Sequence, residues 1–383
     1  MDRDWANLPA NALDSIVERL ESVWDYLQFS LVCRPWCCVA KNDHIQRAKM
    51  MSTIHRPPML LIAADKGDAW NVYNVVDNKV IDLQLDGQNK RFCGSSKGWV
   101  IAVEDNFAVT LINPFFRVKG RRNKENSTIC LPQLKPPSTE EARIVWTKNF
   151  DRYVIKATIS ADPILDAFNC IVVVIYQPSN QLAFIRLATD TAWTYLDTSR
   201  IDDVVCFQGK FFAVDRWSNL LSFDVTACEV EHDAHGVKLP QTMWLVNKYL
   251  VDSNGKELLM VRRYYDFDDN MLRTTMKFEV FKMDFNKGKW IKKKTLGDVA
   301  IFLGDNSAVS VLASNFPGCE PNCIYFSHDR DRVTMDFRGH GPQDCGVYDL
   351  LNKSFSQPYA TEAKTLLKMT KLFPLWVVPS FQL

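Results

Sequence analysis

The residue types most able to do chemistry in this chain are cysteine and histidine near its C-terminal end. Cys319 and Cys323 are followed by His328, and His340 and Cys345 come further on. Thiolates and imidazoles are the ligands of structural zinc, but such sites favour tight cysteine spacings that hold four ligands together. Cys323 opens an apolar run typical of a strand, so we expect these cysteines to be buried small hydrophobes that bind no metal.

Patterns for phosphate binding and acid–base catalysis are weak. Gly94–Gly98 places a lysine among small residues, but it lacks the glycine spacing and the Lys-Ser/Thr ending of a phosphate-binding loop, and we interpret it as a hairpin turn. The acid–base pairs His232/Asp233 and His328/Asp329 are indistinguishable from surface loops. The sequence therefore predicts a chain that is not an enzyme, has no catalytic residues of its own and needs no cofactor.

Composition excludes several classes of partner. The 383 residues are 47% hydrophobic and 24% charged, which is typical of globular protein, and the net charge of +1 gives no global field for nucleic acid or an acidic membrane. The longest apolar run, Cys170–Tyr176, is far shorter than the ~20 residues of a membrane helix. The 11 cysteines are odd in number and scattered singly, as expected for reduced thiols in the cytoplasm and/or nucleus.

The first predicted elements of the chain are helices in an N-terminal segment. Leu13, Ile16, Val17 and Leu20 lie at i, i+3, i+4 and i+7, which places them on one face of a helix, and Pro9 suits its first turn. Further helices are predicted at 22–31, from Pro35 to Ala40, and at 43–50. Three such short helices cannot bury their apolar faces by themselves. We therefore expect this segment to bind a partner protein that covers those faces.

This segment resembles an F-box. The resemblance rests on Leu8-Pro9, Leu13, Ile16, Leu20, Leu27 and the run Leu31-Val32-Cys33-Arg34-x-Trp36, over roughly residues 5–45. F-box helices dock onto Skp1, the linker subunit of cullin–RING ubiquitin ligases. The resemblance implies a Skp1-binding site made of Leu8, Pro9, Leu13, Ile16, Leu20, Leu31, Val32, Cys33 and Trp36. Pro35 departs from the family's usual small polar residue, which a helix start tolerates. The alternative is an ordinary helical cap on the large domain, with Trp36 in its core.

From about Met59 the pattern changes from helical to alternating. Closely spaced strand-like runs bounded by Gly, Asn, Asp and Pro, without helical patterns between them, argue for an all-β architecture. The predicted strands are Met59–Ala63, Trp70–Val76, Gly98–Val103, Ala108–Ile112, Tyr153–Ile159, Ile171–Tyr176, Leu182–Leu187, Ala192–Leu196, Val204–Phe207, Lys210–Val214, Leu220–Val225, Leu258–Tyr264, Lys277–Met283, Lys289–Ile291, Val299–Phe302, Ser307–Ala313, Cys323–Phe326 and Gly346–Leu350. Comparable strand ends recur every ~40–60 residues, which is the length of a propeller blade. We predict a β-propeller of about six blades, because radial repetition protects strand edges.

A second resemblance supports this architecture. Asp298–Asn306, Asn315–Phe326, Gly94–Trp99, Gly346–Leu350 and Leu375–Ser380 look like the signature of a land-plant domain of unknown function, number 295 in its series. The similarity covers most of residues 55–383. It implies a plant F-box protein whose propeller-like domain receives a substrate, and it names no substrate.

Surface segments offer further candidates for recognition. We interpret the basic clusters Lys119–Lys124 and Lys287–Lys294 as a solvated loop and a lysine-protected edge strand, although each could bind an acidic partner or direct nuclear import. Asp266–Asn270 predicts a solvated hairpin tip, and Pro132–Thr139 predicts an exposed loop between blades. Because propellers bind partners with loops at one mouth of the channel, residues 119–143 are the first candidate for part of a recognition surface.

The sequence thus predicts a mainly β protein with an F-box of three to four helices at 1–50 and a propeller at 55–383. We expect the substrate-recognition subunit of a Skp1–cullin–F-box ubiquitin ligase, with a Skp1-like protein and an unknown target as partners, and neither nucleic acid nor membrane. The alternatives are an F-box scaffold or regulator outside a ligase, or a propeller hydrolase or small-molecule binder. The last alternative requires convergent polar side chains in the central channel.

Overall fold

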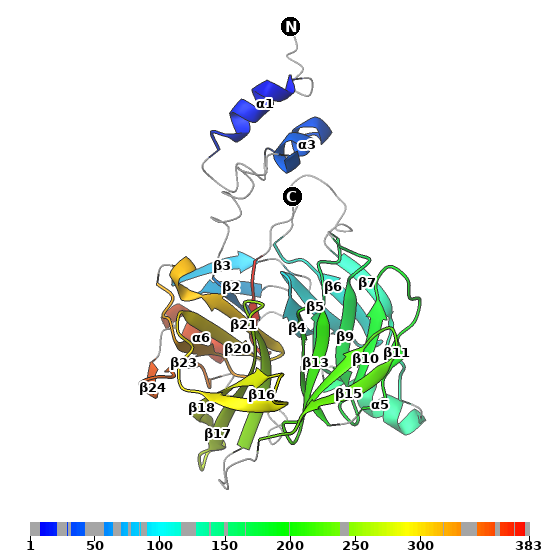
Figure 1. The fold of residues 1–383 in the computed structure, drawn as a ribbon, viewed down its shortest axis with the longest axis vertical. Helices are drawn as coiled ribbons and strands as arrows, with labels where there is room; N and C mark the ends of the chain where they lie inside the picture. The colour runs from blue at the N-terminus through cyan, green and yellow to red at the C-terminus, as the bar shows by residue number, and fades with distance from the viewer. Residues whose placement is uncertain are drawn as a thin grey trace.

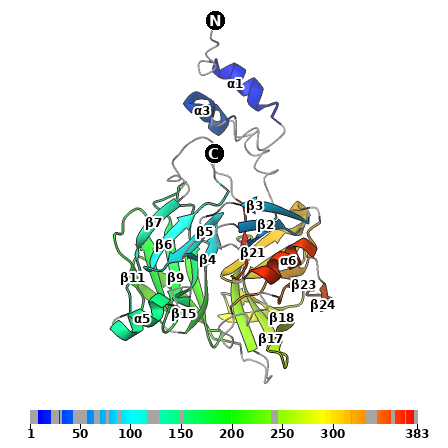
Figure 2. The same cartoon turned by 180° about the vertical axis from the view of Figure 1, so that it is seen from behind.

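The computed structural model describes residues 8–20, 29, 32–42, 57–63, 70–75, 78–83, 85, 90–115, 128–137, 139–148, 152–164, 166–198, 200–237, 245–316, 318–330, 343–356, 361–370 and 372–379. Within these ranges, two helices lie together at one end of the molecule, and strands build most of the rest (Figure 1 and Figure 2). The predicted helices at 22–31 and 43–50 lie outside the described residues apart from Phe29, which is helical. The predicted domain boundary between residues 50 and 55 lies outside them too.

The N-terminal helices are α1 (Ala10–Val17) and α3 (Arg34–Asn42). Leu13 and Val17 form the buried face of α1, and they share a cluster with Phe29 and with Ala40 of α3. The rings of Phe29 and Trp36 lie 4.6 Å apart between centroids. This small cluster contains no propeller residue, so the two described helices pack mainly on each other. None of the described helices is long and apolar enough to cross a membrane.

The described strands form six sheets, which are the blades of a propeller. In each blade the strands are named from the innermost outward. Blade 1 contains β25 (Leu375–Val377), β1 (Met59–Ala63), β2 (Trp70–Asn74) and β3 (Lys79–Leu83). Blade 2 contains β4 (Lys90–Ser96), β5 (Trp99–Glu104), β6 (Ala108–Ile112) and β7 (Thr128–Gln133). Blade 3 contains β8 (Val154–Ile159), β9 (Ile171–Tyr176), β10 (Gln181–Arg186) and β11 (Thr194–Tyr195).

The other three blades complete the ring. Blade 4 contains β12 (Ile201–Phe207), β13 (Lys210–Asp215), β14 (Leu220–Asp224) and β15 (Glu229–Ala234). Blade 5 contains β16 (Leu245–Ser253), β17 (Glu257–Phe267), β18 (Arg273–Asp284) and β19 (Lys289–Lys293). Blade 6 contains β21 (Ser307–Leu312), β20 (Val299–Gly304), β22 (Cys323–Phe326), β23 (Gly346–Asp349) and β24 (Ser354–Ser356).

The innermost strands touch in a closed circle. Each strand in the series β25, β4, β8, β12, β16 and β21 contacts the next, and β21 contacts β25. Blade 1 is built from both ends of the propeller, because β25 pairs with β1 and sets Trp376 opposite Leu60. The indole of Trp376 is fully buried and donates to the Leu303 carbonyl at 2.9 Å. The last strand, β25, therefore joins blade 1 to blade 6.

Blade 6 departs from the simple order in which the chain runs outward from the channel. β20 turns at Asp305 and Asn306 into β21, which takes the innermost place. The chain then passes through the 3-10 turn η4 (Ala313–Asn315), and β22 pairs with β20 in parallel. The tight turn between β20 and β21 is thereby brought to the end of the central channel.

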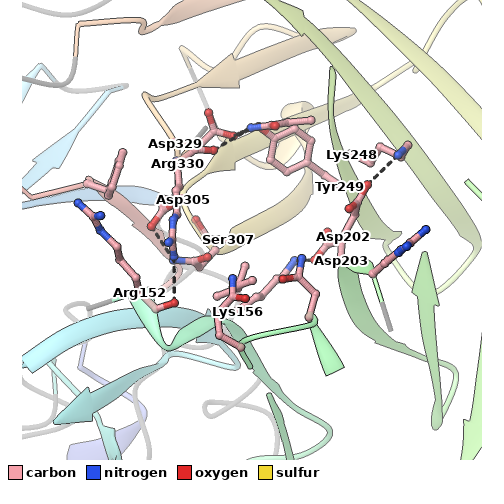
Figure 3. Close-up of a pocket in the computed structure, with 18 of the residues that line it drawn as sticks. Arg152, Lys156, Asp202, Asp203, Lys248, Tyr249, Asp305, Ser307, Asp329 and Arg330 are labelled. Atoms are coloured by element: carbon pink, nitrogen blue, oxygen red, sulfur yellow. Dashed lines mark hydrogen bonds and ion pairs between the residues drawn. The ribbon is translucent and has the colours of Figure 1, made fainter. Parts of the chain in front are cut away.

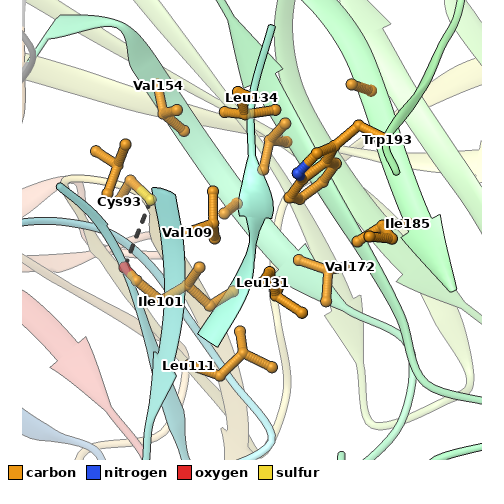
Figure 4. Close-up of a cluster of buried hydrophobic side chains, with 14 of the residues drawn as sticks. Cys93, Ile101, Val109, Leu111, Leu131, Leu134, Val154, Val172, Ile185 and Trp193 are labelled. Carbon is orange, nitrogen blue, oxygen red and sulfur yellow. Dashed lines mark hydrogen bonds between the residues drawn. The ribbon is translucent and has the colours of Figure 1, made fainter. Parts of the chain in front are cut away.

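Apolar side chains fill the spaces between neighbouring blades. Alternate residues of a strand point to opposite faces, so Val172 of β9 packs toward blade 2 while Val173 packs toward blade 4. Figure 4 shows the first of these cores, where Leu111 and Leu131 of blade 2 meet Val172 and Trp193 of blade 3. Middle strands such as β9 and β10 are buried on both faces, which explains their apolar sequences.

Most predicted strands are confirmed, and the six blades agree with the predicted count. Lys289–Lys293 is the outermost strand of blade 5, as predicted. In the predicted hairpin tip Asp266–Asn270, residues 268–270 are exposed between β17 and β18, whereas Asp266 and Phe267 belong to β17. The strands that the sequence missed are β3, β4, β7, β15, β16, β24 and β25. The sequence also missed the helices α5 (Glu140–Lys148) and α6 (Thr361–Met369).

Two predicted loops need correction. Gly94–Ser96 belongs to strand β4, so the predicted turn is right only for Lys97 and Gly98. In the predicted loop Pro132–Thr139, the first two residues belong to β7 and Leu134 is fully buried in the core between blades 2 and 3. The basic cluster Lys119–Lys124 lies outside the described residues.

Candidate functional site

A polar cavity opens where the innermost strands of the propeller begin. Its volume is about 710 Å³. Innermost strands of blades 2 to 6 contribute Arg91, Lys156, Asp203, Lys248 and Ser307 to its lining, and Phe373 comes from the segment that leads into β25 of blade 1. We call this cavity the mouth. Figure 3 shows its labelled side chains converging from different strands on one space. The innermost strands carry polar residues here because they face the channel rather than another blade.

Two lysine–aspartate pairs line the side of the mouth formed by blades 3 to 5. Lys156 pairs with Asp203, and the Nζ of Lys248 lies 2.7 Å from Oδ2 of Asp202. Asp203 also accepts the Leu250 backbone N–H at 2.6 Å. Burial raises the pKa of Asp203, although the charge of Lys156 opposes this shift. These carboxylates are therefore held by cations and backbone donors of the protein itself.

The opposite side of the mouth is organised by the turn between β20 and β21. Asp305 is 4% exposed, and its Oδ2 lies 2.5 Å from Nη2 of Arg91. Its Oδ1 accepts the backbone N–H of Arg330 at 2.9 Å. The Arg330 guanidinium donates to the carbonyl of Arg152 at 3.3 Å. Asp305 thus joins three segments far apart in sequence.

A buried ionic network supports the mouth from behind. Arg263 is fully buried, and its Nη1 and Nη2 contact Asp329 and Asp344 at 3.1 and 2.8 Å. Arg273 pairs with the same two carboxylates at 2.5 and 3.0 Å. Burial would raise the pKa of Asp329, but the charges of Arg273 and Arg263 outweigh it and hold that pKa well below its usual range. The ionised Asp329 accepts a hydrogen bond from Tyr249, which lines the mouth.

His328 lies within this network and is 8% exposed. Its Nδ1 accepts the Asp344 backbone N–H at 3.2 Å. Burial, reinforced by the charge of Arg273, lowers the pKa of His328 to about 3. The sequence could not distinguish His328 and Asp329 from a surface loop, whereas the structure buries both where blades 5 and 6 meet.

The rim of the mouth carries exposed aromatic and basic side chains. Trp217 is 55% exposed, and the Arg200 guanidinium carbon lies 5.2 Å from the ring centroid. Arg216 beside it is exposed. Asp215 accepts the backbone N–H of Trp217 at 2.8 Å and that of Asn219 at 2.8 Å, which fixes the turn. The Arg216 backbone N–H donates to the Arg200 carbonyl at 3.0 Å, so the two arginine-bearing segments are tied together.

The predicted burial of the C-terminal cysteines is confirmed for two of them. Cys319 is 8% exposed and Cys323 is 2% exposed. Burial raises the pKa of Cys319 to about 11 and that of Cys323 to about 12, which favours neutral thiols over metal-binding thiolates. The described residues contain no cluster suited to a metal ion. His340 lies outside the described residues, and the absence of bound metal stays a prediction.

The segment Gly94–Gly98 also has the Gly-x-Ser-x-Gly spacing of a hydrolase nucleophile elbow. Such an elbow joins a strand to a helix, whereas this segment joins β4 to β5. The Ser96 hydroxyl donates to the Ile159 carbonyl of the neighbouring blade at 3.3 Å. The structural context therefore does not match a nucleophile.

The residues predicted to bind Skp1 occupy different environments in the helical module. Leu13 is 1% exposed inside the cluster, whereas Val32 is 53% exposed and Pro9 is also exposed. Five more are partly buried: Leu8, Ile16, Leu20, Cys33 and Trp36. Leu31 lies outside the described residues. The structure thus leaves part of this apolar set at the surface, and its partner stays a prediction.

The sequence did not predict the mouth. Residues 128–137 and 139–143 of the proposed recognition surface 119–143 contribute nothing to the lining described above, and 119–127 lie outside the described residues. One part of the sequence did point to the mouth. The signature segment Asp298–Asn306 ends in Gly304, Asp305 and Asn306, which all line the cavity. The remaining lining residues come from strands and turns scattered along the chain.

Curated relatives align with nearly the whole chain. The F-box protein SKIP23 of Arabidopsis thaliana is 26% identical over 381 residues, covering 88% of this chain and 89% of that protein. A further Arabidopsis thaliana F-box protein is 26% identical and covers 99% of this chain and 96% of its own length. A putative F-box protein of the same plant is 27% identical, with 93% of each chain covered.

The predicted resemblance to plant F-box proteins with a propeller is therefore confirmed. The model of one protein family, described as the KIB1-4 β-propeller, matches residues 72–349. This match spans strands of all six blades. The chain belongs to the KIB1-4 β-propeller family.

Proposed function

We propose that this protein is the substrate-recognition subunit of a Skp1–cullin–F-box ubiquitin ligase that acts in the cytoplasm or nucleus. Relatives named as F-box proteins align with 88 to 99% of the chain, and the alignment that covers 99% takes in the helical module. The observation that carries the proposal is that this module keeps apolar side chains at its surface, Val32 with 53% exposure and Pro9 beside α1. In the proposal these side chains contact a Skp1-like protein.

The mechanism is proximity. The helical module binds the ligase, the propeller binds the target protein, and the target's lysines are held near a ubiquitin-loaded enzyme elsewhere in the complex. The chain needs no catalytic group of its own for this role. The carboxylates of the mouth are already held in ion pairs, which suits binding better than proton transfer.

Co-purification with a Skp1-like protein tests the docking site. The variant Val32→Asp places a charge on the exposed apolar position, and we expect at least a tenfold loss of binding. Leu8→Ala/Pro9→Ala should also weaken binding. Ser15→Asp is the matched control, because Ser15 is exposed on α1 outside the predicted contacts. Unchanged binding of both test variants would show that the docking assignment is wrong.

Two rival roles give other outcomes. An F-box scaffold would bind the Skp1-like protein but would neither recruit a cullin nor promote ubiquitination of a bound target. A small-molecule binder or hydrolase is the rival that requires polar side chains converging in the channel, and the mouth supplies them. It would bind or turn over a small ligand without any need for the Skp1-like protein.

A further inference from the structure

We propose that the mouth binds a peptide segment of the target protein that carries anionic side chains, either carboxylates or phosphates. The identity of this segment as part of a ubiquitination target rests on the proposed function. The binding site itself rests on the charge, exposure and geometry of the residues described above.

The charge of the mouth is the first argument. Seven Arg or Lys side chains and four Asp side chains are found among the described lining residues. Three of these aspartates pair inside the mouth, with Lys156, Lys248 and Arg91. The fourth, Asp329, pairs with Arg263 and Arg273 behind the wall. The carboxylates of the mouth are thus held by cations inside it or behind its wall, and the exposed Arg200 and Arg216 add positive charge at its edge.

Two arginines, Arg200 and Arg216, lie at the edge of the mouth. Arg216 lies in the turn between β13 and β14 of blade 4, and Arg200 lies in the link that precedes β12. A guanidinium presents a planar fork of donors that matches carboxylate and phosphate oxygens. Arg200 and Arg216 are exposed and therefore accessible to a ligand. Their chemistry favours an anion over a neutral ligand.

The rim argues for a protein ligand rather than an isolated anion. Trp217 exposes 55% of its surface beside the two exposed arginines. Tryptophan and arginine are the residue types that most often dominate protein–protein binding energy. A large exposed indole beside guanidinium groups offers apolar contact to backbone and side chains that flank an anionic residue.

The rim is also fixed before a ligand arrives. Asp215 is 6% exposed and holds the turn of Trp217 through hydrogen bonds to two backbone N–H groups. The bond from the Arg216 N–H to the Arg200 carbonyl, at 3.0 Å, joins this turn to the preceding link. A preorganised site loses less conformational entropy on binding.

The size of the mouth sets the form of the ligand. A volume of about 710 Å³ lies within the ~300–1,000 Å³ of ligand pockets. Such a cavity admits a few side chains of an extended segment but no folded domain. The geometry therefore fits a peptide segment that inserts its anionic side chains and lays its flanking residues over Trp217.

The test measures fluorescence anisotropy of labelled decapeptides with the full-length protein. The three probes share a glycine–serine background and carry three glutamates, three phosphoserines or no charge. We expect the anionic probes to bind at least tenfold more tightly than the neutral probe, and the affinity to fall with added salt. The glutamate and phosphoserine arms identify which anion the site prefers.

Charge-reversal variants locate the binding. Arg200→Glu/Arg216→Glu should weaken binding of the anionic probes at least tenfold, and Trp217→Ala should weaken it severalfold. Lys289→Glu/Lys294→Glu is the matched control, because it changes net charge equally at the exposed outer edge of blade 5. We expect this control to bind within twofold of the unmodified protein.

Three results would overturn the inference. They are equal weakening in both double variants, equal binding of neutral and anionic probes, or complete displacement of the probes by an equal concentration of inorganic phosphate. Co-purification with the Skp1-like protein is measured on the same variants. Peptide binding without co-purification would reject the ligase role alone, whereas co-purification without peptide binding would reject the mouth alone.

Discussion

Asp329 shows how a single residue connects the surface of the mouth to the interior. It accepts hydrogen bonds from Tyr249 and Asn247 on the channel side and pairs with two buried arginines on the other. Breaking such a buried pair by removing one partner leaves an uncompensated charge. The position of Tyr249 in the mouth therefore depends on Arg263 and Arg273, which a ligand would not touch.

His328 makes this network sensitive to acid. The folded protein holds its pKa near 3, below the 6.5 of an unperturbed histidine, because the imidazole is buried beside Arg273. As pH falls from 6.5 toward 3, the unfolded chain takes up a proton that the folded protein does not. The stability contributed by neutral His328 is therefore lost across this window, by about 1.4 kcal/mol per pH unit.

Urea denaturation between pH 7 and pH 5 measures this dependence. We expect His328→Gln to reduce the slope of unfolding free energy against pH by about 1.4 kcal/mol per unit below pH 6. The same substitution at His232, which is exposed on β15, is the control for the change of side chain. Equal slopes in the protein and in His328→Gln would show that His328 is not held neutral by burial.

At the scale of elements, the sequence predicted some strands well and missed others for a physical reason. The predicted set includes all the middle strands, such as β9, whose residues are buried on both faces and read as an apolar run. The missed strands lie at the inner or outer ends of the sheets, as β4 and β15 do. Inner strands face the channel and outer strands face solvent, so their apolar periodicity is weak.

Gly94 illustrates why an inner strand can resemble a turn. A Cβ atom at this position would lie 2.0 Å from the carbonyl oxygen of Ala157 on β8. The innermost strands of blades 2 and 3 therefore approach too closely for any side chain there. A glycine followed by two serines predicts a turn by composition, although close packing of two backbones is the actual reason for it.

The variant Gly94→Ala should lower the free energy of unfolding by about 1–3 kcal/mol, because β4 must move away from β8 to admit the methyl group. Ser95→Ala, at the next position of β4, should change it by less than about 0.5 kcal/mol. Chemical denaturation of both variants gives the comparison. Equal stability of Gly94→Ala and the unmodified protein would contradict the close approach.

At the scale of the whole molecule, stability depends on closing the ring. β25 fills a place between β21 and β4 and pairs with β1, so the two ends of the propeller meet in one blade. Trp376 is the centre of this closure, with its ring against Phe302 at 4.9 Å and its N–H bonded to Leu303. The mouth needs the closed ring, because its lining combines strands of blades 2 to 6 with Phe373, which leads into β25.

Trp376→Ala should destabilise the protein by about 3–5 kcal/mol through the loss of a buried indole and the cavity left behind. Trp217→Ala makes the same change at a 55% exposed position and should cost less than about 0.5 kcal/mol. Thermal and urea denaturation followed by circular dichroism measure both. A similar loss of stability in the two variants would show that β25 does not hold the ring closed.

By itself, the sequence determined the helical stripe at the N-terminus, the middle strands of the blades and the propeller class. These three features follow from the spacing of apolar residues along the chain, because that spacing indicates whether a segment is buried on one face or on both. Family resemblance added the F-box and its expected partner. Only the tertiary structure decided where the mouth lies and which residues line it. Arg91 meets Asp305, and Asp203 meets Lys156, only because the ring brings strands from distant parts of the chain together. No local pattern records a contact that exists only after the ring has closed.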